Sequence, residues 1–387
     1  MSIPASTKFF IRNVVTKTGG IYIHVPFCQK RCIYCDFYST TCGLEWKRSY
    51  ISTLKREMHL RRSEIDSSRV PSLYIGGGTP SQLPSDLLIE LFQAIQDNYT
   101  LADDAEVTIE VNPDDVTPSL IGTLLQTPVN RISMGVQTFS DELLRLLNRR
   151  HTSKQALQAV QQFREAGYEN ISLDLIYGLP GQTLEGWQYD VQQLLRLDVP
   201  HLSAYALSYE TGTPLYKMLQ EGKVSEVSDE LSWRMYEYLM DEAAALGYEH
   251  YEISNFAKPG MHARHNSSYW DGSPYLGLGP GAHSYDGKNV RRSNNTSLEE
   301  YVSATADVPH QVEVLTREEQ YDELIMTRLR TASGLSLHLL TPEQRLYCLQ
   351  MAEPHIHAGN MHRKGEILCL SREGIFVSNS VISDMMC

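Results

Sequence analysis

Six short β-prone runs, each followed by a helical stretch, constrain the fold of this chain more than any other feature of its sequence. The predicted strands are Ile21–Val25, Ser72–Gly76, Glu106–Val111, Arg131–Val136, Asn170–Tyr177 and His201–Leu207. Amphipathic segments lie between them, with apolar residues at spacings of three and four: Tyr50–Ile65, Leu87–Asn98, Lys154–Ala166 and Leu184–Leu195. Strands that alternate with helices pair in parallel through right-handed crossovers. The sequence therefore predicts an α/β fold, either a doubly wound sheet or a full or partial (βα)6 barrel.

Polar residues and glycines gather where these strands end, namely Cys28, Gly76–Gly78, Thr79, Glu110, Asn112 and Gln137. Both architectures place ligands at the carboxyl ends of parallel strands. Asp174 lies inside the fifth strand between two leucines, where an ionised carboxylate is costly unless it is paired. A salt bridge to a nearby arginine is the plain structural explanation for Asp174, and a ligand site is the functional one.

The rest of the chain has a different character. A helix over Asp229–Leu246 leads into an aromatic, Gly-rich segment, and after Pro309 we expect two helices and a terminal hairpin of Ile367–Leu370 with Ile375–Val377. We therefore divide the chain into a leader (1–19), a barrel (20–256), a connecting segment (257–309) and a small C-terminal α+β domain (310–387). The leader weakly resembles a transit peptide, and a short frayed leader is the simpler interpretation.

The charge balance limits the partners. There are 34 Lys and Arg against 47 Asp and Glu, which gives a net charge of −13 and disfavours nucleic-acid binding. No run approaches the roughly 18 apolar residues of a membrane-spanning helix, and the N-terminus lacks a secretory signal. We expect a cytoplasmic protein.

Four of the seven cysteines, Cys28, Cys32, Cys35 and Cys42, fall close together near the N-terminus. In a reducing compartment such a cluster indicates a metal or redox site rather than disulfides. Three thiolates from one loop, those of Cys28, Cys32 and Cys35, can hold three irons of a four-iron cluster and leave the fourth iron open to another chelator. The alternative is a zinc site built from all four, although zinc motifs normally contain two separated pairs.

The Cys-x3-Cys-x2-Cys spacing after the first strand resembles the radical S-adenosylmethionine (SAM) superfamily, in which the open iron chelates the amino and carboxylate groups of SAM. The segments Tyr22–Cys28, Gly76–Pro80, Arg131–Gln137 and Asp174–Pro180 are similar to the family of oxygen-independent coproporphyrinogen III oxidase and its relatives. This resemblance runs from about Ile21 to the C-terminus. It implies a partial (βα)6 TIM-like barrel of the radical SAM type, followed by a small C-terminal α+β domain.

The resemblance also implies residues that hold cofactors. Tyr22, Gly77 and Glu110 match contacts to the cluster-bound SAM. Positions that hold a second SAM molecule in the oxidase are matched by Tyr34, Gly78, Thr79, Gln137, Arg149, Asp174 and Ala206. Glycines at such a turn allow backbone amides to approach the methionine part of the cofactor. A plain strand-ending turn is the alternative for the glycine triplet on its own.

One departure separates this chain from the oxidase itself. Phe37 stands where the oxidase has a further cysteine, and a phenylalanine cannot relay an electron or a proton as a thiol might. The pattern is similar instead to the heme chaperones of the family, whose HNxxYW segment is matched by His265 to Trp270. That match implies His265 as an axial heme ligand, with Tyr269 and Trp270 packing against the porphyrin and His283 as the second candidate ligand. A histidine satisfied by structural contacts is the alternative.

The function implied by the resemblance is heme binding and delivery by a protein that carries a [4Fe–4S] cluster and SAM. Two other functions stay open: oxidative decarboxylation of coproporphyrinogen III by a radical enzyme, and a zinc-stabilised binding module. The implied partners are heme, apo-hemoprotein acceptors, including membrane-associated ones, a flavodoxin-type reductant and a second copy of the chain. Lys30 and Arg31, between the first two cysteines, would offset the cluster's negative charge or guide an acidic reductase, or else are solvated loop charges.

Overall fold

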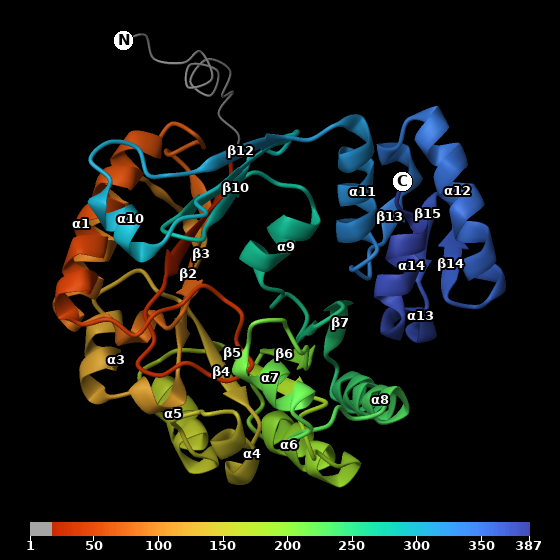
Figure 1. Ribbon diagram of the computed structural model, residues 1–387, viewed down its shortest axis with the longest axis horizontal. Coiled ribbons are helices and arrows are strands. Elements are labelled where there is room, and N and C mark those ends of the chain that lie inside the picture. The colour runs from red at the N-terminus through yellow and green to blue at the C-terminus, as the bar shows by residue number, and fades with distance from the viewer. Residues whose placement is uncertain (1–17) are drawn as a thin grey trace.

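The computed structural model describes residues 18–387, so the predicted leader lies almost wholly outside the described residues. All six predicted strands are present and pair in parallel in sequence order (Figure 1). They are β1 (Gly20–Val25), β2 (Val70–Gly77), β3 (Leu101–Val111), β4 (Arg131–Gln137), β5 (Asn170–Tyr177) and β6 (His201–Ala206). The predicted partial TIM-like barrel is confirmed.

The barrel does not close, because β1 and β6 pair with added strands rather than with each other. Beyond β6 lie β8 (Asn255–Ala257) and β7 (Glu249–Glu252). On the other side β9 (Tyr275–Leu278) runs parallel to β1. It is followed outward by β10 (His283–Tyr285), β11 (Val290–Ser293) and β12 (Gln311–Val314), which are antiparallel. The result is one twelve-stranded sheet with the six parallel strands at its centre.

Helices cover the outer face of the parallel strands (Figure 1). They are α1 (Leu44–Arg61), α2 (Ser85–Asn98), α3 (Pro118–Leu124), α5 (Ser153–Glu165), α6 (Leu184–Arg196) and α8 (Asp229–Ala245). The short helices α4 (Asp141–Leu146) and α7 (Pro214–Gln220) adjoin the cysteine loop, where Ile33 hydrogen-bonds the backbone of Leu147 and Leu215. Short 3-10 helices span Pro80–Gln82 and Pro113–Asp115. In α6, Trp187, Val191 and Leu194 recur at helical spacing and are fully buried, so periodicity places the apolar side of the helix against the sheet. No helix in the described residues has the length and apolar character needed to cross a membrane.

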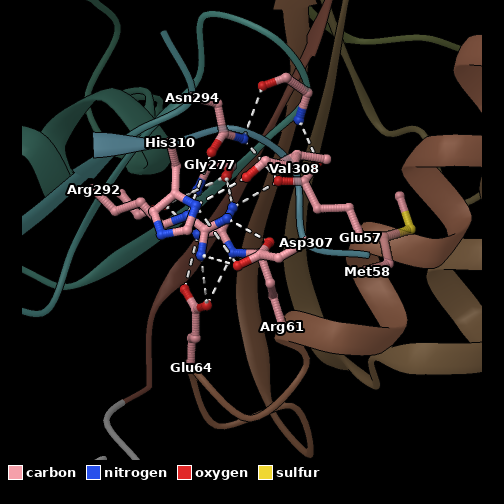
Figure 2. Close-up of polar contacts among 12 residues, drawn as sticks. Glu57, Met58, Arg61, Glu64, Gly277, Arg292, Asn294, Asp307, Val308 and His310 are labelled. Carbon is pink, nitrogen blue, oxygen red and sulfur yellow. Dashed lines mark hydrogen bonds and ion pairs between the residues drawn. The ribbon is translucent and has the colours of Figure 1, made fainter. Parts of the chain in front are cut away.

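A buried charged network joins the barrel to the added strands (Figure 2). Arg61, in the last turn of α1, pairs with Glu57 at 2.8 Å and Glu64 at 2.8 Å. The same guanidinium donates to the Gly277 carbonyl in β9 and to the Ser284 hydroxyl in β10, both at 2.8 Å. Because buried charges are normally paired and hydrogen-bonded, this network fixes the position of β9 and β10 relative to α1.

The C-terminal part contains a three-stranded sheet, in the order β13-β15-β14, with its own apolar core. The remaining elements are α9 (Arg264–Trp270), α10 (Leu298–Ser303), α11 (Arg317–Arg328), β13 (Leu335–Ser336), a 3-10 helix over Leu337–Leu339, α12 (Pro342–His357), β14 (Met361–Lys364), β15 (Ile367–Leu370), α13 (Arg372–Phe376) and α14 (Ser378–Met385). This composition is α+β, as expected for the end of the chain.

The predicted strand at Ile375–Val377 is wrong. β15 pairs with β14, which precedes it, and the turn between them contains Gly365 at a φ of +60°. The chain then enters α13, where the Ser371 side chain accepts a hydrogen bond from the Gly374 amide and caps the helix. The serine cap outweighs the β-branched residues that suggested a strand.

Candidate functional site

A pocket of about 440 Å³ opens at the carboxyl ends of the parallel strands and extends into the barrel. Residues of strands β2 to β6 and of the loops after β1, β2, β3, β4 and β6 line it. They include all of the cysteines and cofactor-binding residues singled out in the sequence except Tyr22: Cys28, Cys32, Cys35, Tyr34, Gly77, Gly78, Thr79, Glu110, Gln137, Arg149, Asp174 and Ala206. These residues span nearly 180 positions of the chain. They lie together because the carboxyl ends of parallel strands meet at the same edge of the sheet. Tyr22 lies off the pocket, and its hydroxyl hydrogen-bonds His24 Nδ1 at 2.9 Å.

The cysteine loop that follows β1 is held at several points. The Cys28 amide donates to the Thr40 carbonyl at 2.9 Å, and the Cys28 sulfur lies 3.6 Å from Thr79 Oγ1. Arg149 donates to the Cys32 sulfur at 3.5 Å. Burial raises the pKa of the Cys28 thiol, and burial together with the neighbouring Cys32 and Cys28 thiols raises the pKa of Cys35 to about 11. Since metals bind cysteine as thiolate, three cysteine side chains facing one pocket suit a group that binds them in the deprotonated form.

Cys42 does not belong to this set. Its sulfur lies 3.0 Å from Thr40 Oγ1, and its side chain packs against the apolar core instead of lining the pocket. Among the described residues no group of three His, Cys, Asp or Glu side chains is arranged to hold a single metal ion. A tetrahedral zinc site gathers its ligands around one centre, whereas a four-iron cluster distributes its thiolates over separate irons. The donor set therefore fits the cluster better than zinc.

The glycine turn after β2 brings backbone to the pocket wall. Gly77 has a φ of +112°, and a Cβ there would lie 2.7 Å from the His24 ring. A Cβ on Gly78 would lie 2.9 Å from the Phe27 backbone. The Gly77 amide donates to Glu110 at 3.0 Å. Only glycine allows this turn to pack against the cysteine loop.

Gln137 closes β4 in an unusual conformation. Its φ is +69°, in the left-handed region that side chains other than glycine rarely adopt, and the pairing of β4 with β5 shifts register between Gly135 and Gln137. Such a residue costs on the order of 1–3 kcal/mol and is found mainly at ligand sites. The conformation belongs to a residue that lines the pocket, as the sequence suggested.

Glu110 and Asp174 are carboxyl groups inside the barrel. Tyr74 donates to Glu110 at 2.8 Å, and burial, with a smaller contribution from Asp174, raises the pKa of Glu110 to about 7. Burial raises the pKa of Asp174 to about 6, although Ser203, Arg131 and other neighbours favour its ionised form. Asp174 makes no ion pair within 4 Å with any described residue, so the salt bridge offered as its structural explanation is absent from residues 18–387.

We predict that Glu110→Gln stabilises the unliganded protein at pH 8. The pKa of Glu110 is raised from 4.5 to about 7 on folding, so the folded chain holds a proton that the unfolded chain releases between these values. Stability is therefore lost as pH rises through this window, by up to about 3 kcal/mol. Urea unfolding of the variant and of wild type should differ at pH 8 and converge near pH 4.5. Glu90→Gln, at a half-exposed residue, is the control, and an equal effect of both variants at pH 8 would contradict the prediction.

The HNSSYW segment forms α9, and its histidine faces inward. His265 is 1% exposed, with Nδ1 2.9 Å from the Ser72 hydroxyl and Nε2 2.9 Å from the Tyr269 hydroxyl. Its ring stacks on Tyr74 with 5.4 Å between centroids. Burial lowers the pKa of His265 to about 3, so the ring is neutral. Both ring nitrogens are thus engaged by the protein in this conformation.

The other residues implied in heme binding also lie outside the pocket. Tyr269 packs edge-on against Tyr275 at 4.7 Å, and the Trp270 Nε1 is buried without a hydrogen-bond partner in the described residues. His283 is exposed on β10. Of α9, only Asn266 reaches the pocket. The structure therefore separates the candidate heme ligands from the candidate cluster site.

Sequence reasoning identified Asp174 but missed the rest of the inner part of the pocket. Its walls come from alternate positions in the later strands: Arg131 and Ser133 in β4, Ser172 and Asp174 in β5, and Ser203 and Tyr205 in β6. The signal was present as polar residues at every second position, since alternate residues of a strand face the same side. In a parallel barrel a polar inward face indicates a ligand chamber instead of a packed interior.

Comparison with known proteins agrees with this geometry. Residues 22–194 match the radical SAM superfamily. The heme chaperone HemW of Lactococcus lactis is 39% identical over 323 residues, which are 83% of this chain and 84% of that protein. The heme chaperone HemW of Mycobacterium tuberculosis H37Rv is 33% identical over 374 residues, which are 95% of this chain and 94% of that protein. The chain belongs to the HemW family of radical SAM proteins.

A solved structure supports the fold of this HemW-family chain. Coproporphyrinogen III oxidase (HemN) from Escherichia coli, a radical SAM enzyme, superposes with a TM-score of 0.84 at 21% identity and covers 100% of this chain and 94% of its own. Identity at that level shows a shared architecture. Membership of the radical SAM superfamily implies a [4Fe–4S] cluster and SAM. The cysteine loop lies within the matched residues 22–194, and its three cysteines line the pocket.

Proposed function

We propose that this HemW-family protein binds heme and delivers it to apo-hemoproteins in the cytoplasm. The observation that carries the proposal is the likeness, over most of both chains, to proteins named heme chaperone HemW, at 39%, 38% and 33% identity. Phe37 is consistent with it. This residue is 65% exposed beside Cys35 at the edge of the pocket, where the oxidase is expected to have a cysteine.

Cys28, Cys32 and Cys35 would hold a [4Fe–4S] cluster at the pocket, with SAM on the open iron. The cluster supplies an electron when it is reduced. The chain's own residues position these groups: Arg149 donates to the Cys32 sulfur, and the Gly77 turn is held by Glu110. Lys30 and Arg31 line the mouth and carry positive charge at the place where an acidic reductase would approach.

For heme, we propose His265 as the axial ligand in a conformation in which α9 has moved. Its neutral imidazole is the form that binds iron. Ligation through Nε2 exchanges the hydrogen bond to Tyr269 for an iron bond. This movement must break the hydrogen bonds from the amides of Arg264 and His265 to Glu106, at 2.9 Å each, and the contact of Ser72 with Nδ1. It must also release the stacking on Tyr74 and the packing of Tyr269 on Tyr275. His283, already exposed, is the alternative ligand that needs no movement.

We expect hemin to bind the full chain with a Soret band and near-stoichiometric saturation. His265→Ala should shift the band and weaken binding at least tenfold, because one protein ligand to iron is lost. His283→Ala is the matched control. An unchanged spectrum and affinity in His265→Ala, with a change in His283→Ala, would assign the ligand to His283; no saturable Soret band in wild type would contradict heme binding itself.

The two rival functions have less support. Formation of protoporphyrinogen by the anaerobically reconstituted protein would establish the oxidase activity in place of heme delivery. A zinc-stabilised module would require Cys42 beside the other three cysteines, and Cys42 lies off the pocket.

A further inference from the structure

Arg131, the first residue of β4, has a buried guanidinium whose hydrogen-bond donors find no partner among the described residues. Its side chain lines the inner end of the pocket, and the residue is 2% exposed. Its Nε is buried without a partner, and the guanidinium makes no hydrogen bond or ion pair within 4 Å with any residue between 18 and 387. Removing a charge from water costs several kcal/mol unless a partner is in place. Such a residue needs an explanation.

Other buried arginines of this chain have hydrogen-bond or ion-pair partners within the protein. Arg61 pairs with Glu57 and Glu64, and Arg292 pairs with Asp307 at 2.8 Å (Figure 2). Arg149, which shares the pocket with Arg131, also has an unpartnered Nε, but its terminal nitrogens donate to the Asn112 side chain at 2.9 Å and to the Gly135 carbonyl. The missing partner is therefore particular to Arg131 and not a general property of buried arginines in this fold.

The groups around Arg131 do not replace a partner. Asp174 attracts the Arg131 guanidinium, but no ion pair within 4 Å joins them, and Ser203 and Ser133 hydrogen-bond its carboxyl. The buried Glu106 carboxylate accepts from the amides of Arg264 and His265 instead. The Asn266 side chain, at the start of α9, lines the same inner end of the pocket and makes no hydrogen bond with a described residue. Two donors, a guanidinium and an amide, are therefore available inside the barrel to an acceptor that comes from outside.

We propose that Arg131, with Asn266, binds a carboxylate group that enters through the mouth pocket. A guanidinium and a carboxylate are both planar and match in a two-bond, bidentate geometry. A carboxylate supplies the two acceptors that the guanidinium lacks. A phosphate dianion carries twice the charge and would be repelled more strongly by the carboxyl groups of Asp174 and Glu110, which line the same pocket. The carboxylate of cluster-bound SAM is expected on the open iron, which leaves Arg131 for a second molecule.

A carboxylate could reach Arg131 from two sources with the same chemistry. One is a small free organic acid. The other is a propionate of a tetrapyrrole, whose ring would meet the exposed aromatic side chains of Phe37 and Tyr205 where they line the pocket. The tetrapyrrole source rests on the proposed heme function, and the free acid does not.

The first experiment asks whether Arg131 serves structure or binding. In the absence of ligand, Arg131→Met should unfold at the same or higher urea concentration than wild type, because an unpaired buried charge has been removed and Asp174 can take up a proton. Arg150→Met is the control; this arginine pairs with Asp114 and Asp115 at 2.8 and 2.6 Å, and its loss should lower the midpoint. If Arg131→Met lowers the midpoint as much as Arg150→Met or more, Arg131 is structural and the proposal is overturned.

The second experiment measures binding in the full, anaerobically reconstituted chain. Acetate and succinate, compared with chloride at equal ionic strength, should raise the melting temperature of wild type and of Arg150→Met. The midpoint of this titration should move at least tenfold higher in Arg131→Lys, which keeps the charge but loses the fork of donors, and the effect should vanish in Arg131→Met. If the titration midpoint is the same in all four proteins, the proposal is overturned. This outcome does not depend on the stability of any variant.

Hemin and hemin dimethyl ester separate the two sources. If a propionate is the carboxylate, hemin affinity falls at least tenfold in Arg131→Met, and the ester binds wild type as weakly as hemin binds the variant. If a free acid is the occupant, hemin binds wild type and variant equally while the succinate effect is still lost. Wild type that binds no hemin but retains the succinate effect would contradict the heme function and leave the carboxylate site in place. If Arg131→Met retains both the hemin affinity and the succinate effect of wild type, the proposed site is overturned.

Discussion

Replacing Cys28, Cys32 or Cys35 singly with serine should abolish the iron–sulfur cluster, whereas replacing Cys42 should leave it intact. The three lining cysteines come from one loop and face one pocket, so each is expected to bind one iron. Cys42 is bonded to Thr40 and packed on the core, away from that pocket. The effect is expected to be complete, because a cluster that already lacks a protein ligand on one iron cannot lose another and stay bound.

The measurement is iron and acid-labile sulfide after anaerobic reconstitution, together with the visible absorption that gives the protein its brown colour. Wild type and Cys42→Ser should contain about four of each per chain, the composition of a [4Fe–4S] cluster. The three serine variants should contain almost none. Zinc without sulfide in wild type, or loss of metal in Cys42→Ser as complete as in the other variants, would indicate the four-cysteine zinc site instead.

The barrel and its mouth could be predicted from the sequence because both follow from short-range patterns. Strand runs such as Asn170–Tyr177 agree with the structure to the residue, since apolar residues at alternate positions between turns are typical of a strand with one face on the core. The position of these residues then follows from topology: Cys28 and Gln137 are far apart in the chain, yet both lie where parallel strands end. No long-range contact had to be guessed to bring them together.

What could not be predicted depends on contacts between distant segments. The burial of His265 is set by Ser72 and Tyr74 in β2, nearly 200 residues earlier, and no local pattern shows that both of its ring nitrogens are engaged. The sequence identified Arg131 only as part of a motif. Its lack of a hydrogen-bond partner depends on how the strands around it assemble, which no local pattern shows. One wrong prediction has a local cause: the β-branched residues after Ser371 suggested a strand, whereas the Ser371 side chain caps a helix there.

The buried network of Figure 2 should matter more to stability than any ion pair on the surface. Glu57 accepts hydrogen bonds from the Gly279 amide at 2.9 Å and from the Asn294 and Tyr301 side chains at 2.7 Å each. Arg61 neutralises it from the next turn of the same helix. If Arg61 is removed, the Glu57 carboxylate stays buried with its charge unpaired, and breaking a buried pair in this way costs about 3–5 kcal/mol.

We therefore expect Arg61→Met to lower the free energy of unfolding by about 3–5 kcal/mol, and Lys55→Met by about 1 kcal/mol or less. Lys55 is the matched control because it lies in the same helix, α1, and pairs with Glu90 at 2.9 Å, but both side chains are almost half exposed. The midpoint of urea unfolding should fall with little change in slope. Equal effects of the two substitutions would show that solvent screens the network as it screens the surface pair. A double variant, Arg61→Met with Glu57→Gln, should recover part of the loss, since it removes the unpaired charge along with its partner.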